Sequence, residues 1–356
     1  MSLTTTHKNR PVVRRQSRRI TNLVSVVVPA YNAAGCLGRC IEAIQRQSYQ
    51  PIEIIVVNDG STDATEEVAT GFGDRIQYIS QQNRGETAAR NRGFEQARGE
   101  FVTFIDHDDF WEPAFVEKTI EFLKNHPKAI AVSTGHIHRS ALSRSAHIQP
   151  AFLDDQSDGN NAGDIEPFVI ERFFKFWSEH NHVCAGSSML RGSLLDEAGG
   201  QREDLVLSGD MEYWAYLATF GKWGFIPEVL LNIDGTQVPR GNLYSKFYDR
   251  YQRCATVENW ESRIRPRLNQ NDLDGYLRVR GRVATGYTFA HVFVGKDREA
   301  RQTARQYKAH LEGRYGRLWK LGLSAGWLSW KVVCLATRAR IRTQYYLAEK
   351  RRRITP

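Results

Sequence analysis

The chain has 356 residues, of which 25% are charged and 41% hydrophobic, so its composition is that of a folded globular protein and excludes disorder of the whole chain. Its net charge of +9 is unevenly distributed: residues 1–22 carry +6, residues 295–356 carry +12, and the residues between them carry −9. The chain has no run of 18 apolar residues, and no apolar segment follows its basic start, so we expect neither a transmembrane helix nor a secretory signal.

Cysteine usage points to the cellular compartment. The five cysteines are an odd number without a C-x-x-C pair, which fits a reducing environment and predicts a cytoplasmic location. Cys36 and Cys40 are four residues apart in a helical pattern, a spacing more typical of core packing than of a metal site. The basic ends indicate a polyanionic partner or simply a solubilising tail. Because the N-terminal arm lacks interleaved aromatic residues, we expect no nucleic-acid partner.

In the first 138 residues, short apolar runs alternate with helical patterns. This alternation predicts a buried, mostly parallel α/β sheet with helices on both faces. Ligands of such sheets bind outside the carboxyl ends of the strands. The predicted strands are Val24–Pro29, Ile52–Val57, Ile76–Ser80 and Phe101–Ile105, and the predicted helices are Cys36–Gln47, Thr62–Thr70, Gly85–Ala97 and Pro113–Asn125.

The second part of the chain changes character twice. Residues 140–165 are rich in Ser, Asp, Gly and Asn and predict a mobile insert, either a surface loop or a lid. The predicted elements that follow are a helix at Glu166–Glu179, a strand running into a helix within 183–200, a helix at Asp210–Phe220 and a strand at Gly224–Leu231; beyond Gly241 the pattern is wholly helical. We therefore expect a basic flexible arm (1–22), an α/β domain (23–240) and a helical C-terminal region (241–356) with a basic amphipathic tail.

The tail has two interpretations. Residues 318–342 place Trp319, Trp327 and Trp330 among aliphatic and basic residues. This composition suits a helix lying in a membrane interface, with its tryptophans at headgroup depth and its cations near anionic lipid. The alternative is a helix packed on the α/β domain.

Polar clusters follow the predicted strands and are the candidate site. Each cluster alone is explained as a turn or a helix cap, but together, at one edge of one sheet, they predict a ligand site. The clusters are Pro29-Ala30-Tyr31-Asn32, Asn58 to Asp63, Asn83-Arg84-Gly85 continuing to Arg90-Asn91, and Asp106-His107-Asp108-Asp109.

The last cluster is the sharpest of them. Three aspartates within four residues repel one another unless a cation or hydrogen-bond donors compensate them. Mg²⁺ and similar hard cations prefer carboxylate oxygen and commonly share their coordination with substrate phosphates. A helix-capping cluster ahead of Pro113 is the alternative. Alternate residues of an extended segment face opposite ways, so we expect His107 to point away from the metal.

These motifs resemble those of the family 2 glycosyltransferases with the GT-A fold. The resemblance rests on VSVVVPAYNAAGCLGRCIEAIQRQSYQPIEIIVVNDGSTDAT and NRGETAARNRGFEQARGEFVTFIDHDDFWEP, so it runs from Val24 to Pro113, and it continues more weakly to residue 221. It implies a GT-A fold: a mostly parallel sheet flanked by helices, with the helical C-terminal region outside the resemblance.

The resemblance also implies a role for each matching residue. For the nucleotide base, it implies that Tyr31 stacks on the base, that Asp59 hydrogen-bonds it, and that the lining is formed by Pro29, Ala30, Tyr31 and Asn32. For the sugar and phosphates, it implies that Gly85, Arg90 and Asn91 lie along them, and that Asp106-His107-Asp108 is the DxD motif, in which Asp106 lies near the ribose and holds Mn²⁺ or Mg²⁺ together with Asp108. Asp210 would be the catalytic base, with Glu212 in reserve.

By this resemblance the protein is an inverting, metal-dependent glycosyltransferase of the hexosyltransferase type. Its donor would be a nucleotide-diphosphate sugar, with UDP expected. Its acceptor would be a glycan or a lipid-linked sugar of bacterial cell-surface polysaccharide synthesis. The enzyme would be cytoplasmic, with peripheral contact at the inner face of the cell membrane through residues 315–353.

The sequence departs from the family pattern at two places and leaves other functions open. The base position usually holds an acidic pair, but here Asp210 follows a glycine, and Asp234 stands where many relatives have a histidine near the metal. A sugar-phosphate nucleotidyltransferase is an alternative, although Ala33-Ala34-Gly35 is a poor match to the Gly-rich loop of such enzymes. A non-catalytic nucleotide-sugar-binding protein is another.

Overall fold

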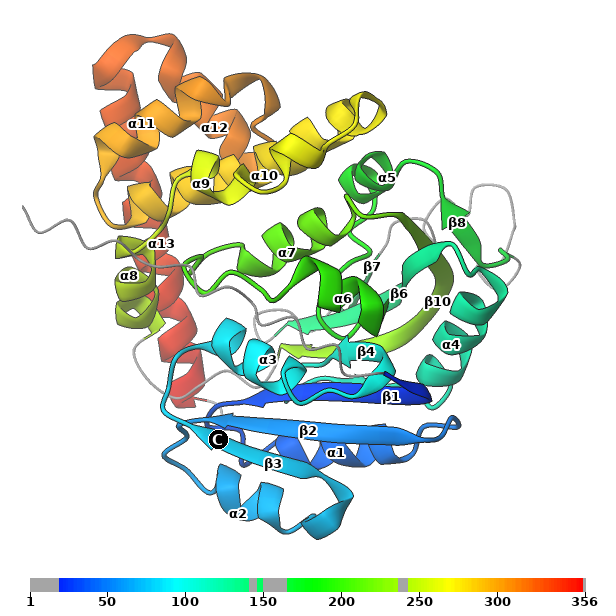
Figure 1. Cartoon of the computed structure of the whole chain (residues 1–356). Helices are drawn as coiled ribbons and strands as arrows, with labels where there is room; N and C mark the ends of the chain where they lie inside the picture. The colour runs from blue at the N-terminus through cyan, green and yellow to red at the C-terminus, as the bar shows by residue number, and fades with distance from the viewer. Residues whose placement is uncertain (1–18, 141–145, 150–164, 236–242, 355–356) are drawn as a thin grey trace, which may run out of the picture.

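A large mixed sheet runs through the middle of the protein (Figure 1). The computed structural model describes residues 19–140, 146–149, 165–235 and 243–354, and within them ten strands form one sheet in the order β3-β2-β1-β4-β9-β6-β10-β5, with β7 beside β6 and β8 beside β10. The strands are β1 (Ile20–Ala30), β2 (Ile52–Asp59), β3 (Gln77–Gln81), β4 (Gly99–Phe104), β5 (Phe110–Trp111), β6 (Ala129–Ser140), β7 (Ala146–Gln149), β8 (Phe168–Ile170), β9 (Ser188–Arg191) and β10 (Lys222–Gly235).

The first half of the sheet is parallel, as the alternating pattern predicts. β1 pairs in parallel with both β2 and β4, and β2 pairs in parallel with β3. The crossovers contain the helices α1 (Leu37–Gln45), α2 (Thr65–Thr70) and α3 (Glu86–Phe94). Val24 to Ala30 are all buried, because helices cover both faces of β1. The parallel arrangement brings the carboxyl ends of β1, β2 and β4 to one edge of the sheet.

The second half of the sheet is mixed. β9 pairs antiparallel with both β4 and β6, and β6 pairs in parallel with β10. The helices of this half are α4 (Phe115–Asn125), α5 (Phe173–Glu179), α6 (Gly192–Ala198) and α7 (Gly209–Leu217). The prediction of one helix over Glu166–Glu179 is wrong at its start. Residues Phe168–Ile170 instead form β8 against β10, where Phe168 packs edge-on against Phe225.

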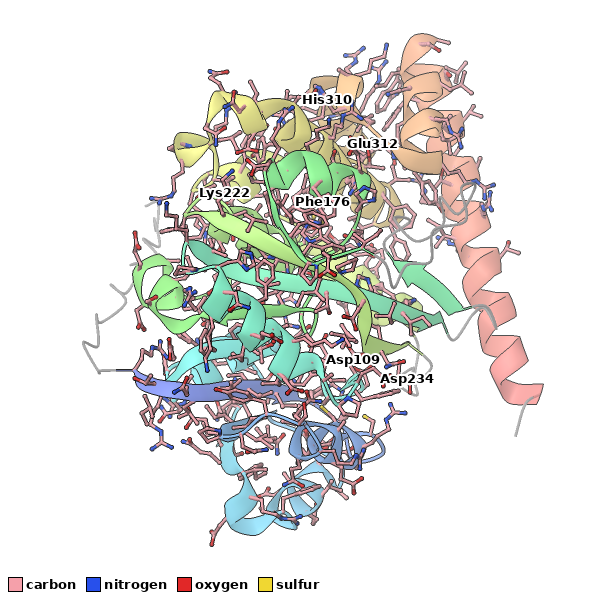
Figure 2. All side chains as sticks on the ribbon, turned by 90° about the vertical axis from the view of Figure 1, so that its right-hand side faces the viewer. Asp109, Phe176, Lys222, Asp234, His310 and Glu312 are labelled. Carbon is pink, nitrogen blue, oxygen red and sulfur yellow. The ribbon has the colours of Figure 1, made fainter. Side chains whose placement is uncertain are left out.

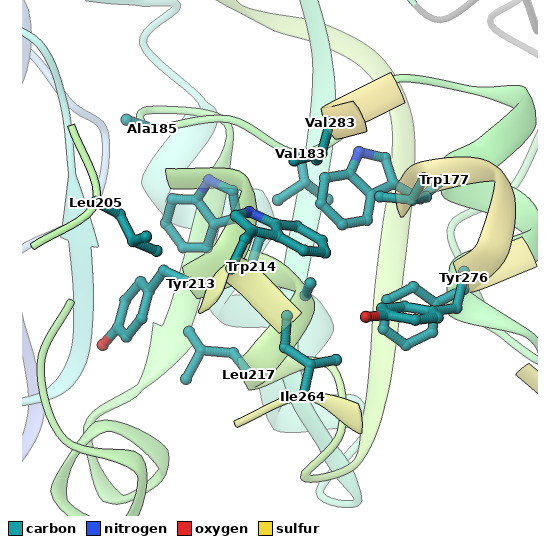
Figure 3. Packing of buried hydrophobic residues seen from close by; sticks show 14 of the residues in the cluster. Trp177, Val183, Ala185, Leu205, Tyr213, Trp214, Leu217, Ile264, Tyr276 and Val283 are labelled. Carbon is teal, nitrogen blue, oxygen red and sulfur yellow. The ribbon is translucent and has the colours of Figure 1, made fainter. Parts of the chain in front are cut away.

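The helical region shares its core with the α/β domain. Its helices are α8 (Leu243–Gln252), α9 (Val257–Glu261), α10 (Leu273–Phe293), α11 (Asp297–Gln306), α12 (Gly313–Ser324) and α13 (Gly326–Ile354). Figure 3 shows Trp177 and Trp214 of the α/β domain in one cluster with Ile264 and Tyr276 of the helical region. A Cβ at Gly275 would lie 2.3 Å from the backbone nitrogen of Lys175, so α10 approaches α5 backbone to backbone. The helical region and the α/β domain therefore share one core.

The tail corrects the prediction for two of its three tryptophans. Trp319 and Trp330 are fully buried and pack against each other in the core, with ring centroids 5.7 Å apart and ring planes tilted by 50°. The indole of Trp330 also donates to the backbone oxygen of Asp297 at 2.9 Å. These two rings cannot lie at headgroup depth, because α12 and α13 pack over α10 and α11. Trp327 is exposed.

The predicted arm and insert lie mostly outside the described residues, namely 1–18, 141–145 and 150–164. The part of the arm that is described is structured: β1 begins at Ile20, and Arg19 donates to Asp196 at 2.9 Å. Within the described ranges, no helix has both the length and the apolar character needed to cross a membrane.

Candidate active site at the strand ends

The aspartate cluster follows β4 directly. The backbone N–H of Ile105 still bonds to Val27, and then the Asp109 N–H closes a turn on the backbone oxygen of Asp106 at 3.0 Å. His107 Nδ1 lies 3.0 Å from the backbone oxygen of Pro29, so the imidazole faces the end of β1. This contact ties the DxD segment to the strand that begins the predicted nucleotide site.

Arg90 is the buried cation of the site. Its guanidinium, on α3, donates to Asp106 at 2.6 Å and pairs with Glu86 one turn earlier. Burial lowers the pKa of Arg90, but the neighbouring Glu86 and Asp106 raise it above its ordinary value, so the guanidinium stays charged. Its position therefore sets the orientation of Asp106.

Glu86 is a site residue that the sequence analysis missed. Arg90 lowers the pKa of Glu86, while loss of hydration and the charges of Asp106 and Asp210 raise it, and the net direction is upward. Asp210 thus lies within electrostatic reach of the Glu86–Arg90 pair. The four-residue spacing of Glu86 and Arg90 on a helix was the available signal.

Asp109 and Asp234 bring the end of β10 to the cluster. Figure 2 shows the two side chains next to each other, and the Asp234 N–H donates to Asp109 at 3.0 Å. Arg39 on α1 donates to the Asp234 carboxylate at 2.7 Å and to the backbone oxygen of Asp108 at 2.8 Å. From the sequence, Asp234 was expected here only by analogy with the histidine of many relatives. Its contacts now make it a member of the same cluster.

Negative charge is in excess at this edge. Burial, together with the charges of Asp106 and Asp108, raises the pKa of Asp109 to about 9. Burial raises the pKa of Asp108 as well, and the charges of Asp106 and Asp234 act in the same direction. The arginines of the cluster do not offset this crowding.

The donor set fits a hard divalent cation that shares its coordination with a substrate. Asp106 and Asp108 offer carboxylate oxygens, which are the ligands that Mg²⁺ and Mn²⁺ prefer. Among the described residues, no group of three or more His, Cys, Asp or Glu side chains converges on one point. A metal here would therefore need phosphate oxygens to complete its coordination shell.

The predicted base-lining segment ends β1. Pro29 and Ala30 are the last residues of the strand, and the Tyr31 ring that follows is 41% exposed. Asn32 adopts φ 51°, and its side-chain oxygen accepts from the Thr62 N–H at 2.8 Å. Asn32 therefore joins the ends of β1 and β2, while Tyr31 is left with a free aromatic face.

Asp59 organises the loop that leads into α3. Its carboxylate accepts from the backbone N–H groups of Arg84 at 2.9 Å and Gly85 at 2.8 Å, and from the Gln81 side chain at 2.7 Å. Gly85 has φ 92°, a conformation that favours glycine. The structure thus gives Asp59 a loop-shaping contact that the sequence analysis did not foresee.

Asn91 also bonds to the protein itself. Its amide donates to the Gln201 backbone oxygen at 2.9 Å and to Glu203 at 3.1 Å, and its oxygen accepts from the Gln201 N–H at 2.8 Å. Asn91 therefore fastens α3 to the loop before α7.

Asp210 lies exposed in the first turn of α7. The preceding Ser208 has φ 56°, and a Cβ at Gly209 would lie 3.9 Å from the Thr87 hydroxyl, so α7 begins beside the start of α3. Glu212 does not suit the reserve role. It is fully buried, and Arg263 donates to both of its oxygens, at 2.6 and 2.7 Å.

The helical region holds the loop before Asp210, and this contact was not predicted from the sequence. Residues 199–208 receive hydrogen bonds from successive elements of that region. The donors are Arg250 to Val206 O at 2.6 Å, Trp260 to Ser208 O at 3.0 Å, Tyr287 to Leu207 O at 3.0 Å and Arg263 to Gly200 O at 3.3 Å. The C-terminal helices thus position the segment that leads into Asp210.

Comparison with known proteins finds a family match in the first part of the chain. The family described as "Glycosyl transferase family 2" matches residues 25–197. An uncharacterized glycosyltransferase of Rickettsia typhi, RT0329, is 30% identical over 210 residues, which are 59% of this chain and 63% of the relative. The chain spans less than two thirds of the length of the first curated relatives that it matches.

Solved structures share the fold at low identity. TarS 1–349 of S. aureus, solved in complex with UDP-GlcNAc, has a TM-score of 0.56 and 12% identity, covering 90% of this chain and 92% of that one. The mannosyltransferase PcManGT from Pyrobaculum calidifontis, solved with GDP-Man and Mn²⁺, has a TM-score of 0.53 and 17% identity, covering 89% and 87%. The predicted GT-A fold with a helical C-terminal region is confirmed.

Proposed function

Residues 25–197 form a glycosyl transferase family 2 domain, and on this premise we propose that the protein is an inverting glycosyltransferase that uses a nucleotide-diphosphate sugar. The observation that carries the proposal lies within this domain and just beyond it. The DxD carboxylates, the Asp59 loop and the exposed Asp210 meet at one edge of the sheet. We propose UDP-sugar as the donor and a hydroxyl of a glycan or lipid-linked saccharide as the acceptor, in bacterial cell-surface polysaccharide synthesis.

In this proposal the chain binds the donor across the strand ends. The nucleotide base stacks on the exposed Tyr31, and the loop held by Asp59 borders the base. Asp106 and Asp108 would hold Mn²⁺ or Mg²⁺, which would offset the charge that develops on the leaving diphosphate. Arg90 keeps Asp106 oriented toward that position.

Asp210 serves as the general base. The acceptor oxygen forms a bond to the anomeric carbon as the bond from that carbon to the diphosphate oxygen breaks, and the hydroxyl proton passes to the Asp210 carboxylate. The nucleoside diphosphate leaves on the opposite face, so the configuration inverts. The exposed position of Asp210 at the start of α7 suits contact with an acceptor.

A donor panel tests the proposal. Thermal stabilisation and slow hydrolysis would be measured with UDP-, GDP- and dTDP-sugars, with Mn²⁺ or with chelator, for wild type, Asp108→Asn and the control Asp74→Asn. Asp74 is an exposed aspartate in the short turn Gly73–Arg75 between α2 and β3, and it makes no hydrogen bond in the described structure. We expect metal-dependent UDP binding in wild type and control, and its loss in Asp108→Asn. Equal UDP affinity with and without Mn²⁺ in all three proteins would contradict the proposal.

We also propose that the enzyme works at the cytoplasmic face of the cell membrane. The basic C-terminal region supports this location. Because Trp319 and Trp330 are buried, these two rings are not part of the contact surface.

A further inference from the structure

Exposed apolar side chains are concentrated on α12 and α13. Among the described residues, eight large hydrophobic side chains are exposed, and five of them lie within 15 residues of one another: Leu321, Trp327, Leu328, Val332 and Leu335, with exposed fractions of 40% to 77%. On α13 the last three follow the spacing i, i+4, i+7, which places them in one stripe along the helix. We call these five residues the apolar stripe.

The core does not account for the apolar stripe. The opposite face of α13 carries Trp330, Val333 and Cys334, which are buried against the rest of the helical region. A contiguous exposed patch of aliphatic residues on a soluble domain usually marks a binding surface.

The surroundings of the apolar stripe are cationic. Residues 313–343 contain seven Arg and Lys and no Asp or Glu. Exposed cations flank the stripe at its start, at its middle and at the end of the described side chains: Arg314, Arg317, Lys331, Arg340 and Arg342.

An arginine-lined depression adjoins the apolar stripe at Trp327. It measures about 410 Å³ and is lined by Arg298, Arg301, Gln302, Arg305, Gln306 and Trp327. Arg301 and Lys331 each lie 5.4 Å from the centroid of the Trp327 ring, so this indole joins the depression to the stripe. The arginines are on α11 at spacings of three and four residues, which puts them on one face of that helix.

The positive charge of the depression is largely uncompensated. Within the described part of the chain, none of its three arginines forms a salt bridge with a carboxylate. The nearby Glu258 accepts from Tyr307 at 3.0 Å and from Gln306 at the edge of the depression. The residues that line the depression include three guanidinium groups and no carboxylate, which leaves an anion-binding surface.

We propose that α11, α12 and α13 form a docking face for an anionic membrane surface. The apolar stripe enters the boundary between headgroups and acyl chains, Trp327 lies at headgroup depth, and the arginine-lined depression holds a lipid phosphate. Exposed cations before, within and after the apolar stripe match this surface better than a protein partner, which would have to offer acidic and apolar groups in the same arrangement. This inference deepens the membrane location proposed above and does not depend on sugar transfer.

Vesicle co-sedimentation of the full chain tests the inference. Vesicles of phosphatidylglycerol and phosphatidylcholine in equal parts would be compared with pure phosphatidylcholine, for wild type, Arg298→Ala/Arg305→Ala, Leu328→Ser/Leu335→Ser and the control Arg46→Ala/Arg92→Ala. The control removes two exposed arginines, Arg46 directly after α1 and Arg92 on α3. We expect wild type and control to bind only the anionic vesicles. Loss of the two α11 arginines should weaken binding roughly 25-fold, about fivefold per charge, and loss of the two leucines about tenfold or more.

The outcomes separate this inference from the proposed function. No binding of wild type to anionic vesicles, equal binding to both vesicle types, or variants that bind like the control would each overturn the docking face. If wild type does not bind anionic vesicles, a protein partner becomes the remaining candidate for covering the apolar stripe. UDP-sugar hydrolysis measured without vesicles on the same preparations reports on the donor site alone. Vesicle binding without hydrolysis would contradict only the proposed enzyme, and hydrolysis without vesicle binding only the docking face.

Discussion

Replacing Asp59 with alanine should destabilise the fold as well as weaken nucleotide binding. The substitution removes the acceptor of three hydrogen bonds, of which two come from the backbone of the loop before α3. A hydrogen bond to a charged group contributes about 1.5–3 kcal/mol, and such contributions are not additive. Residues 82–86 are exposed, so water can replace part of what is lost. We therefore expect a loss of about 2–4 kcal/mol in the free energy of unfolding.

Asp59→Asn separates shape from charge. The amide keeps one acceptor oxygen but turns an NH₂ group toward at least one of the N–H donors that the carboxylate now satisfies, so we expect a loss of about 1–2 kcal/mol. Urea unfolding and UDP titration calorimetry would be performed on wild type, both variants and the control Asp74→Asn. UDP affinity should fall by about 1–3 kcal/mol in Asp59→Ala. An Asp59→Ala protein as stable as wild type would refute the loop-shaping contact, and one that binds UDP normally would refute the donor-site role.

Three further predictions concern the base, the core and pH. Asp210→Asn should lower the transfer rate roughly 10²–10⁴-fold with little change in stability or donor affinity. Glu212→Gln should chiefly lower the unfolding free energy, by about 3 kcal/mol, because it breaks the buried pair with Arg263. Steady-state kinetics and urea unfolding distinguish the two variants, and a normal rate in Asp210→Asn would mean that another residue is the base. Trp330→Ala should cost about 3–5 kcal/mol of stability, because the ring is fully buried, and an unchanged melting temperature would contradict the packing of α13. Burial holds the pKa of His182 well below its ordinary value, so the unfolded chain binds a proton that the folded protein does not. The unfolding free energy should therefore fall as pH drops below about 6.5, by roughly 1.4 kcal/mol at pH 5.5. His182→Gln should lose less stability between pH 7.5 and 5.5 than wild type, and equal losses would mean that this imidazole is not the cause.

The parallel half of the sheet could be predicted because its signals are local. VSVVVP and IEIIVV are continuous apolar runs, and such runs form strands buried on both faces. Polar residues directly after those strands had to meet at one edge, so the grouping of Asp59 with the DxD segment followed from topology alone. The start of β8 was mispredicted because Phe168–Ile170 is too short to show a period of its own. Its strand conformation comes from pairing with β10.

The contacts that complete the site are not local and left no signal in the sequence. Arg39 and Asp234 are 195 residues apart and meet only because α1 and the end of β10 flank the same strands. Glu212 looked like a spare base because its position beside Asp210 is visible in the sequence, while its burial against Arg263 is not. In the tail, the spacing of the tryptophans predicts an amphipathic helix, but it does not tell which face the α10–α11 surface covers.

The helical region connects the two proposed surfaces. α8 packs against α13, and its Arg250 holds Val206 in the loop before Asp210. The same arginine lies close enough to Glu86 to lower its pKa. α9 and α10 hold the neighbouring positions of that loop through Trp260 and Tyr287. Because these helices share one core with α11–α13, a membrane bound at the docking face would have a fixed orientation relative to Asp210. An acceptor anchored in that membrane would then be presented to the general base at a constant height, which a flexible tail could not achieve.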